Sequence, residues 1–523
     1  MNFEEIYKSL TARIDILIPL IIFILTFSFY IKFLAPSIFE GDSAEFCIAC
    51  YTLGIPHPNG YPIYTWIGHL FTMIPIGSIA FRVNLMSAFF GAATVSLIYI
   101  IIFKLIKLNN RFNSENNSIK SFKKVLTSNI NVYRYIAVIA AVSFALSKIF
   151  WSQAEIAEVY TLNAFFVAFI ILILLKWSEN REIKLLYLFF FVYGLSIGAH
   201  TSDILFMPVF LLFILWNDYR VFLNYKNFLL FLIFLLIGLS QFIYIFIRAF
   251  QYPEYTVITP GVYEWWNLIT AKQFNSYFII SISKIPNRIL MYWDYLKMDF
   301  FIIGIILGII GIMGLLKRNI KILVLLSLMF VLNITFYLNY YVFDVEVMFI
   351  PSFLIFSIFI GMGLFTAFDF IKNLSKNYKI KISFKKFEID FLKLFILIML
   401  VSSLLIPVNS YFTNYNQIQE SNNDNFAYFA YTTLNEIPSN STIITYWKSY
   451  IAFKYFQMIY KINPNVTIMA VEEEYLLNTT NQKIKNGNVF VFHNIGSISS
   501  DYYLIPYLGF SDIGTIYKLE KIY

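Results

Sequence analysis

Eleven long apolar runs divide this chain of 523 residues, separated by polar or basic segments. A helix needs roughly 20 apolar residues to cross a hydrocarbon core about 30 Å thick. The runs lie at residues 14–34, 79–103, 135–150, 159–175, 185–199, 204–216, 228–247, 300–316, 322–340, 347–368 and 391–408. Because 59% of the residues are apolar and only 13% are charged, a soluble protein is excluded. We expect a polytopic α-helical membrane protein with about 11 transmembrane helices.

Lysine and arginine are concentrated in alternate loops. They gather at residues 104–134 and 317–321, and seven lysines lie between residues 372 and 393. The positive-inside rule places these loops in the cytoplasm. A multi-pass protein of the cell membrane with a cytoplasmic N-terminus follows, and the net charge of +8 then reflects orientation rather than nucleic-acid binding.

The composition changes near residue 409 and predicts two domains, 1–408 in the membrane and 409–523 outside the cytoplasm. Short β-rich runs lie at 442–446, 466–471 and 488–493, and residues 450–461 between the first two have helical spacing. This order predicts a small C-terminal α/β domain containing a βαβ unit. The first outside loop (41–75) and a later one (248–298) are rich in aromatic residues, glycine and proline, which favours interfacial helices.

Several site classes lack support in the sequence. Cys47 and Cys50 are the only cysteines, and no two of the four histidines have the spacing of a zinc motif. No Walker loop or dinucleotide fingerprint is present. Gly304, Gly308 and Gly311 repeat at helical spacing, which indicates close packing between membrane helices rather than chemistry.

Two acidic pairs share a three-residue spacing at the outer ends of the predicted helices. Asp42 and Glu45 lie in GDSAEF, and Glu155 and Glu158 lie in WSQAEIAEVY. The first pair could form a capping box at a helix start, or it could supply a general base or hold a cation. The second pair could be solvated, or functional if it faces a cavity. His57 lies in a proline-locked turn, where a structural role is the more common one.

His200 and Arg248 also end predicted helices on the outer side. Arginine at such a position commonly snorkels toward lipid headgroups. Its planar guanidinium could equally bind a lipid-linked phosphate through two parallel hydrogen bonds. Both roles are open from the residues alone.

Six segments, in this order, resemble the family of transmembrane-protein-260-type O-mannosyltransferases and their prokaryotic relatives. They are GDSAEF (41–46), LGIPHPNGYPIYTWIG (53–68), RVNLMSAFFGA (82–92), FWSQAEIAEVYTLN (150–163), YGLSIGAHTS (193–202) and YVFDVEVMFIPSF (341–353). The stretch YPEYTVITPG (252–261) departs from the family, in which an Asn-Trp-Gly-Asp-Pro-like segment is expected.

The resemblance implies a GT-C-like fold and transfer of a sugar, mannose being the best guess, from a polyprenyl-phosphate carrier to an acceptor hydroxyl. The acceptor would be serine or threonine of a protein, or else a glycan or lipid. Asp42 would be the general base and Glu45 a second catalytic carboxylate. Substrate-binding residues would be His57, Tyr61, Glu155, Glu158, His200 and Arg248. No cofactor is certain, although paired carboxylates could hold Mg²⁺ or Mn²⁺.

Two other classes fit part of the pattern. A transporter could line its path with acids and an arginine, and it would be expected to contain inverted repeats and charges near the bilayer midplane. The sequence contains no convincing internal repeat, and its acids lie at the ends of the runs. A non-catalytic scaffold with a glycan-binding outer domain is the third class. Retention of activity after Asp42→Asn would favour either alternative.

Overall fold

The computed structural model describes residues 3–112, 119–278, 282–377, 381–384, 387–421, 423–493, 496, 498, 501–511 and 513–522. Within these residues, nine helices are long and apolar enough to cross a membrane, and Asn129–Ala145 and Ile183–Ala199 are two shorter apolar helices. Together they account for all eleven predicted spans. The prediction of a polytopic helical protein is confirmed.

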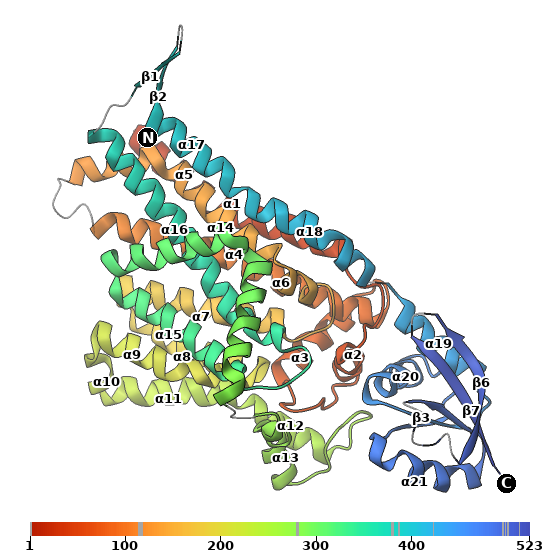
Figure 1. Cartoon of the computed structure of the whole chain (residues 1–523). Coiled ribbons are helices and arrows are strands. Elements are labelled where there is room, and N and C mark those ends of the chain that lie inside the picture. Colours follow the sequence, from red (N-terminus) through yellow and green to blue (C-terminus); the bar gives the residue numbers. More distant parts are fainter. Residues whose placement is uncertain are drawn as a thin grey trace.

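The spans are built from single helices or from two helices in sequence (Figure 1). The single ones are α1 (Phe3–Phe33), α4 (Ile79–Phe112), α5 (Ile119–Ala145), α7 (Tyr160–Asn180), α8 (Ile183–Ala199), α14 (Ile285–Arg318) and α15 (Ile320–Leu338). The paired ones are η1 (Thr201–Phe206) with α9 (Met207–Asp218), α11 (Tyr225–Leu239) with α12 (Gln241–Phe250), η4 (Val345–Phe349) with α16 (Ile350–Asn377), and α17 (Phe391–Ser403) with α18 (Leu405–Ser421).

Helix α16 is the centre of the bundle. Of the apolar window in its span, 94% is buried inside the protein, compared with 17% for α1 at the periphery. Glycines let α14 approach α16 closely, since a Cβ added at Gly311 would lie 1.9 Å from the carbonyl oxygen of Phe359. The glycine spacing therefore has the packing role that the sequence indicated.

Short helices fill the outer loops. The first loop forms α2 (Ser43–Thr52), a turn and α3 (Pro62–Thr72), and α6 (Lys148–Gln153) precedes α7. The later loop contains α13 (Val262–Ile269), η2 (Lys272–Tyr277) and η3 (Ile282–Lys284). Helix α14 is broken by a kink at Phe301, whose φ of 55° is not helical, so residues 285–300 form a helix within the predicted loop and the span predicted from residue 300 begins at the kink. The placement of this loop along the membrane interface stays a prediction. Pro286, near the N-terminus of α14, suits the first helical turn, where its missing N–H has no partner to lose.

The C-terminal domain has a five-stranded sheet in the order β4-β3-β5-β7-β6. Strands β3 (Thr442–Thr445), β4 (Thr467–Ala470) and β5 (Val489–Phe492) are parallel, and β6 (Tyr502–Phe510) and β7 (Gly514–Lys521) add an antiparallel hairpin. Helices α19 (Asn425–Glu436), α20 (Trp447–Ile459), α21 (Glu473–Lys483) and η5 (Ile484–Asn486) complete it. Helix α20 connects β3 to β4, which confirms the predicted βαβ unit.

The two parts of the chain meet where α20 packs against α2 (Figure 1). The predicted division into 1–408 and 409–523 falls inside α18, which runs to Ser421 without a break. A two-stranded hairpin, β1 (Lys381–Phe384) and β2 (Phe387–Asp390), lies at the other end of the bundle. Basic residues at 110–128 and 376–391 have side chains outside the described part of the chain, so the sidedness of the membrane stays a prediction.

Candidate functional site

Asp42 and Glu45 begin α2 but do not form a capping box. Asp42 is the N-cap residue, and its side chain makes no capping hydrogen bond. Glu45 is fully buried in the first turn, and its carboxylate points to the turn that follows α2. The capping-box interpretation is therefore wrong, and both carboxylates are committed to tertiary contacts.

Three donors bind the buried carboxylate of Glu45. The backbone N–H of His57 donates to Oε1 over 2.8 Å, and His57 Nδ1 lies 2.5 Å from Oε2. The hydroxyl of Tyr255 also donates to Oε1, over 2.7 Å. Because a carboxylate can only accept, Nδ1 carries a proton and the imidazole is fixed in one orientation. Burying a charged group without such partners would be strongly unfavourable.

Asp42 lies on the other side of the same imidazole. Its Oδ2 is 3.7 Å from His57 Nε2, an ion-pair distance that is too long for a hydrogen bond. The indole N–H of Trp447, from the C-terminal domain, donates to Oδ1 over 3.3 Å. The Asp42 side chain is 41% exposed, whereas that of Glu45 is not exposed at all. The Asp42 carboxylate therefore faces outward, and the buried Glu45 fixes the imidazole that lies beside it.

His57 is the positive charge of this cluster. Burial lowers the pKa of its imidazole, but the charges of Glu45 and Asp42 outweigh that effect and raise the pKa to about 10. His57 is therefore an imidazolium at neutral pH. His57 is thus a cation between two carboxylates: Glu45, which is buried, and Asp42, which is partly open.

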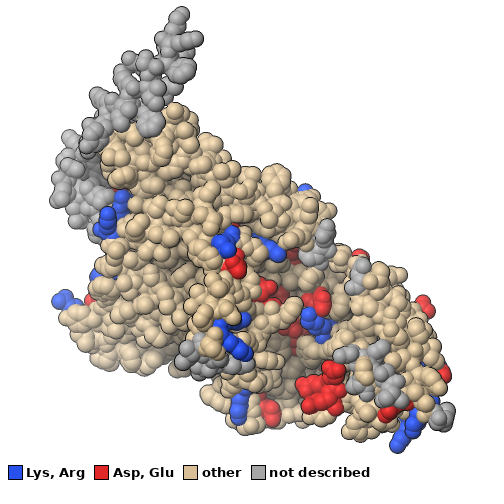
Figure 2. All heavy atoms as spheres, viewed as in Figure 1, with Lys and Arg blue, Asp and Glu red and all other residues tan. Residues whose placement is uncertain are grey.

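Further acids border the open side of Asp42. Burial and the charges of Asp42 and Asp344 raise the pKa of Glu158 well above its usual value. Burial and the charge of Asp42 likewise raise the pKa of Asp344. Figure 2 shows acidic side chains gathered in a hollow between the helical part and the C-terminal domain, with basic side chains along its rim. The negative charge of these acids stabilises a nearby cation, or the protonated form of one of the acids.

Tyr61 and His200 continue the wall of the site. The Tyr61 ring lies 5.3 Å from the His57 ring and 6.5 Å from the His200 ring, centroid to centroid. His200 Nδ1 is 2.7 Å from the hydroxyl of Ser202. Burial and the charge of His57 lower the pKa of His200 to about 4, so this second imidazole is neutral. The structure thus brings Asp42, Glu45, His57, Tyr61, Glu158 and His200 together.

Glu155 and Arg248 have their described contacts elsewhere. The indole N–H of Trp151 donates to the fully buried Glu155. Arg248 donates from Nε to the carbonyl of Leu53 over 2.8 Å and from one terminal nitrogen to the carbonyl of Thr52 over 3.0 Å. These carbonyls end α2, so the guanidinium caps the C-terminus of the helix that carries Asp42.

Two contacts of the site come from residues that sequence reasoning missed. Tyr255 lies in YPEYTVITPG, the stretch that departs from the family pattern, and this departure was its only signal. Trp447 lies 405 residues after Asp42, and nothing in the local sequence relates it to the first outer loop. Both contacts depend on the tertiary fold.

A divalent cation can be tested against the same residues. Ligand atoms of Asp42, Glu45 and His57 all lie within 4.8 Å of one another. Glu45 already accepts three hydrogen bonds, and Asp42 Oδ2 and His57 Nε2 lie 3.7 Å apart on the opposite side of the imidazole. A metal there would have to displace the proton on Nε2, because only a neutral imidazole ligates. Two such atoms are a poor fit to Mg²⁺, which prefers oxygen ligands in an octahedron.

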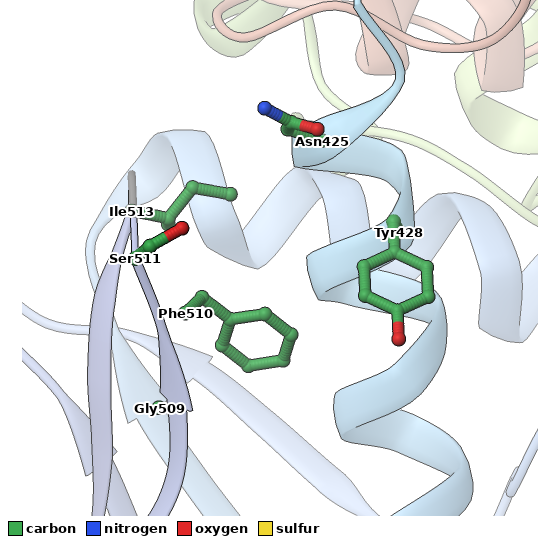
Figure 3. A pocket seen from close by; sticks show the side chains of 6 residues that line it. All are labelled: Asn425, Tyr428, Gly509, Phe510, Ser511 and Ile513. Carbon is green, nitrogen blue, oxygen red and sulfur yellow. The ribbon is translucent and has the colours of Figure 1, made fainter.

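A separate cavity of about 270 Å³ lies in the C-terminal domain (Figure 3). Asn425 and Tyr428 of α19 line one side, and Gly509, Phe510, Ser511 and Ile513 of the β6–β7 hairpin line the other. Its lining residues include no acidic or basic side chain. This cavity is distinct from the acidic hollow.

Comparisons with known proteins agree with the motifs. Residues 42–222 match the family described as the N-terminal domain of protein O-mannosyl-transferase TMEM260. The chain is 22% identical over 489 residues to protein O-mannosyl-transferase tmem260 of Dictyostelium discoideum, covering 84% of this chain and 55% of that protein. It is 30% identical over 145 residues to TMEM260 of Mus musculus, covering 28% of this chain and 17% of that protein. It therefore spans about half the length of the first relative and less of the second.

Among solved structures, ArnT from Cupriavidus metallidurans in the apo state aligns over 98% of both chains, with 8% sequence identity and a TM-score of 0.49. The segments that resemble the TMEM260 family, from GDSAEF to YGLSIGAHTS, fall within or next to the matched range 42–222. The resemblance predicted from these motifs is confirmed: residues 42–222 of the chain are similar to the N-terminal domain of the TMEM260 family.

Proposed function

We propose that this chain is a membrane glycosyltransferase of GT-C type, which transfers a sugar from a polyprenyl-phosphate carrier to an acceptor hydroxyl. The observation that carries the proposal is the geometry of Asp42. It is partly open, it has no hydrogen bond from His57, it accepts one from the indole of Trp447, and the imidazole beside it is anchored by the buried Glu45. Such a carboxylate can accept a proton from a substrate without moving.

In the proposed step, Asp42 removes the proton of the acceptor hydroxyl while that oxygen attacks C1 of the sugar. The bond between C1 and the phosphate oxygen breaks, and polyprenyl phosphate leaves with the electron pair. The reaction inverts C1, and a correctly placed general base contributes about 10²–10⁴-fold to its rate. Because the carrier phosphate is the leaving group, the chemistry requires no nucleotide site.

The surrounding residues have separate roles in this proposal. Glu45 orients the His57 imidazolium, whose charge faces Asp42. Tyr61 and His200 form a wall on which a sugar can stack. Glu158 lines the acceptor side, where its neutral form can donate a hydrogen bond.

The names of the relatives support mannose as the sugar and protein serine or threonine as the acceptor. The outer face of the cell membrane as the site of reaction is supported by the distribution of lysine and arginine. We propose that the step proceeds without a divalent cation, since one carboxylate and one protonated imidazole are poor ligands for Mg²⁺ or Mn²⁺.

The experiment uses purified chain in liposomes with radiolabelled polyprenyl-phosphate mannose and a native membrane extract as the source of acceptors. The unmodified chain should label the protein fraction, and Asp42→Asn should not. Asp294→Asn is the matched control, because Asp294 is 67% exposed and pairs with Lys297 on α14. Equal labelling by Asp42→Asn would contradict the role of Asp42. No labelling by any folded variant would contradict the proposed donor or the enzyme itself. Loss of labelling in EDTA, with recovery on adding Mn²⁺, would contradict the metal-free step.

A further inference from the structure

The C-terminal domain reaches the acidic hollow through the first turn of α20. Trp447 and Lys448 lie in this turn, and both contact the membrane part of the chain. The domain is held there by other bonds as well. The Tyr455 hydroxyl accepts from the backbone N–H of Ala80 over 3.1 Å, and Lys461 pairs with Glu254 over 2.7 Å. The position of α20 over α2 is therefore fixed by contacts outside the hollow.

Trp447 binds the carboxylate that we propose as the base. Its indole N–H donates to Asp42 Oδ1 over 3.3 Å, while Oδ2 faces His57. The indole ring stacks on Tyr450, with centroids 5.7 Å apart. Since one carboxylate oxygen accepts from the indole, rotation of the Asp42 side chain is restricted and Oδ2 stays on the side of His57.

Lys448 brings an exposed positive charge to the same place. Its Nζ lies 3.0 Å from Glu40 Oε1 and 5.5 Å from the centre of the Phe343 ring, and its charge acts on Asp344. The lysine and Glu40 side chains are each about half exposed, at 51% and 53%. An exposed ion pair of this kind contributes little to folding stability, so the lysine is free to exchange Glu40 for another anion.

An anionic donor entering this hollow meets several carboxylates and therefore needs a cation. The family resemblance suggested Arg248 for that task, but two of its nitrogens are bound to the carbonyls that end α2. Lysine is a point-charge ligand for phosphate, with three rotatable donors on a flexible stem. Lys448 carries the positive charge that a phosphate requires, its side chain is exposed, and it lies beside the acids of the site.

We propose that the C-terminal domain completes the substrate site: Lys448 binds the phosphate of the lipid-linked donor, and Trp447 is a positioning residue that holds Asp42. The proposal rests on the proposed glycosyl transfer, which supplies an anionic donor. It assigns a role to a domain beyond residue 222, where the family match ends.

A binding experiment tests Lys448 without requiring turnover. The full chain in nanodiscs is titrated with undecaprenyl phosphate, with undecaprenol as the probe that lacks phosphate, and with inorganic phosphate. Lys448→Gln should weaken undecaprenyl phosphate binding by about tenfold, which corresponds to the loss of one charge-assisted contact. Lys448→Arg should restore most of the affinity. Lys461→Gln is the matched control, since it removes another exposed ion pair between the same two parts of the chain.

The outcomes separate this proposal from the proposed function. Equal undecaprenyl phosphate affinity for the unmodified chain, Lys448→Gln and Lys461→Gln would overturn the role of Lys448, whether or not sugar is transferred. An equal loss in both glutamine variants would also overturn it, because it would mean that only the domain contact matters. Absence of phosphate-dependent binding in the unmodified chain would overturn it too. Failure of sugar transfer despite intact binding would count against the proposed function alone.

Trp447 is tested by kinetics. Trp447→Phe keeps an aromatic ring but removes the N–H, so kcat should fall by about tenfold while KM for the donor changes less than twofold. Trp266→Phe is the control, because Trp266 is 56% exposed on α13 and its ring lies 6.3 Å from that of Trp265, at an interplanar angle of 53°. An unchanged kcat for Trp447→Phe, or a rise in KM alone, would overturn the positioning role.

Discussion

The two acidic pairs of the outer loops have the same spacing and opposite surroundings. In each pair one carboxylate is fully buried, Glu45 in the first and Glu155 in the second. The buried Glu45 is bound by an imidazolium that also faces Asp42, whereas Glu155 is bound by the neutral indole of Trp151. Each pair thus combines a buried carboxylate with a less buried one, and in the first pair an imidazolium lies between the two carboxylates.

Substitutions of the two outward acids, Asp42 and Glu158, should differ most in their effect on sugar transfer. Asp42→Asn should lower sugar transfer by about 10²–10⁴-fold, the typical contribution of a general base. Glu158→Gln should cost less than about tenfold, because the raised pKa of Glu158 favours the protonated form that glutamine imitates. Initial rates at saturating donor measure both. Equal losses of rate would contradict this difference and would mean that Asp42 and Glu158 act on the reaction together.

The buried members give the next largest contrast. Glu45→Gln keeps the shape but removes the charge opposite His57, so we expect a loss of roughly 10–100-fold in kcat, corresponding to about 1.5–3 kcal/mol for a hydrogen bond to a charged group. Glu155→Gln retains an acceptor for the indole of Trp151 and should transfer sugar at nearly the unmodified rate. A large kcat loss in Glu155→Gln with an unchanged melting temperature would show that Glu155 acts on the chemistry.

The pH dependence of stability should contain a contribution from His57 of the first pair. The pKa of His57 is raised to about 10, above the value near 6.5 expected in the unfolded chain. The imidazolium therefore stabilises the fold fully below about pH 6.5, and this contribution is lost as the pH rises toward 10. Thermal unfolding of the unmodified chain should become easier over that range, and His57→Gln should flatten the dependence. An identical pH profile for the two proteins would contradict the charged state of His57.

Arg248 should give the smallest effect, on stability rather than binding. Arg248→Lys removes part of the cap on α2, which we expect to cost about 1 kcal/mol, measured as a lower melting temperature. The affinity for undecaprenyl phosphate should stay within twofold, in contrast to Lys448→Gln. A tenfold loss of affinity would return the phosphate-binding role to Arg248.

Local patterns predicted the parts of the molecule that depend on local physics. The eleven apolar runs, the βαβ unit and the clustering of Asp42 with Glu45 follow from periodicity, strand propensity and spacing. The helix at residues 285–300 was not predicted as a separate element, although the kink at Phe301 lies close to the predicted start of the span at residue 300. The partners of the site were missed for a different reason, since Tyr255 and Trp447 reach Glu45 and Asp42 only after distant segments pack together.

The turn that holds His57 restricts how the outer loops can be exchanged between relatives. Gly60 has a φ of +79°, and a Cβ at that position would lie 2.7 Å from Ile245 and 2.9 Å from Leu268. The turn is therefore packed closely against α12 and α13, which flank the divergent stretch containing Tyr255. A chimera that imports this later loop from a relative must import compatible neighbours of Gly60 as well. Otherwise the imported loop would displace the imidazole of His57, although no residue of α2 had been changed.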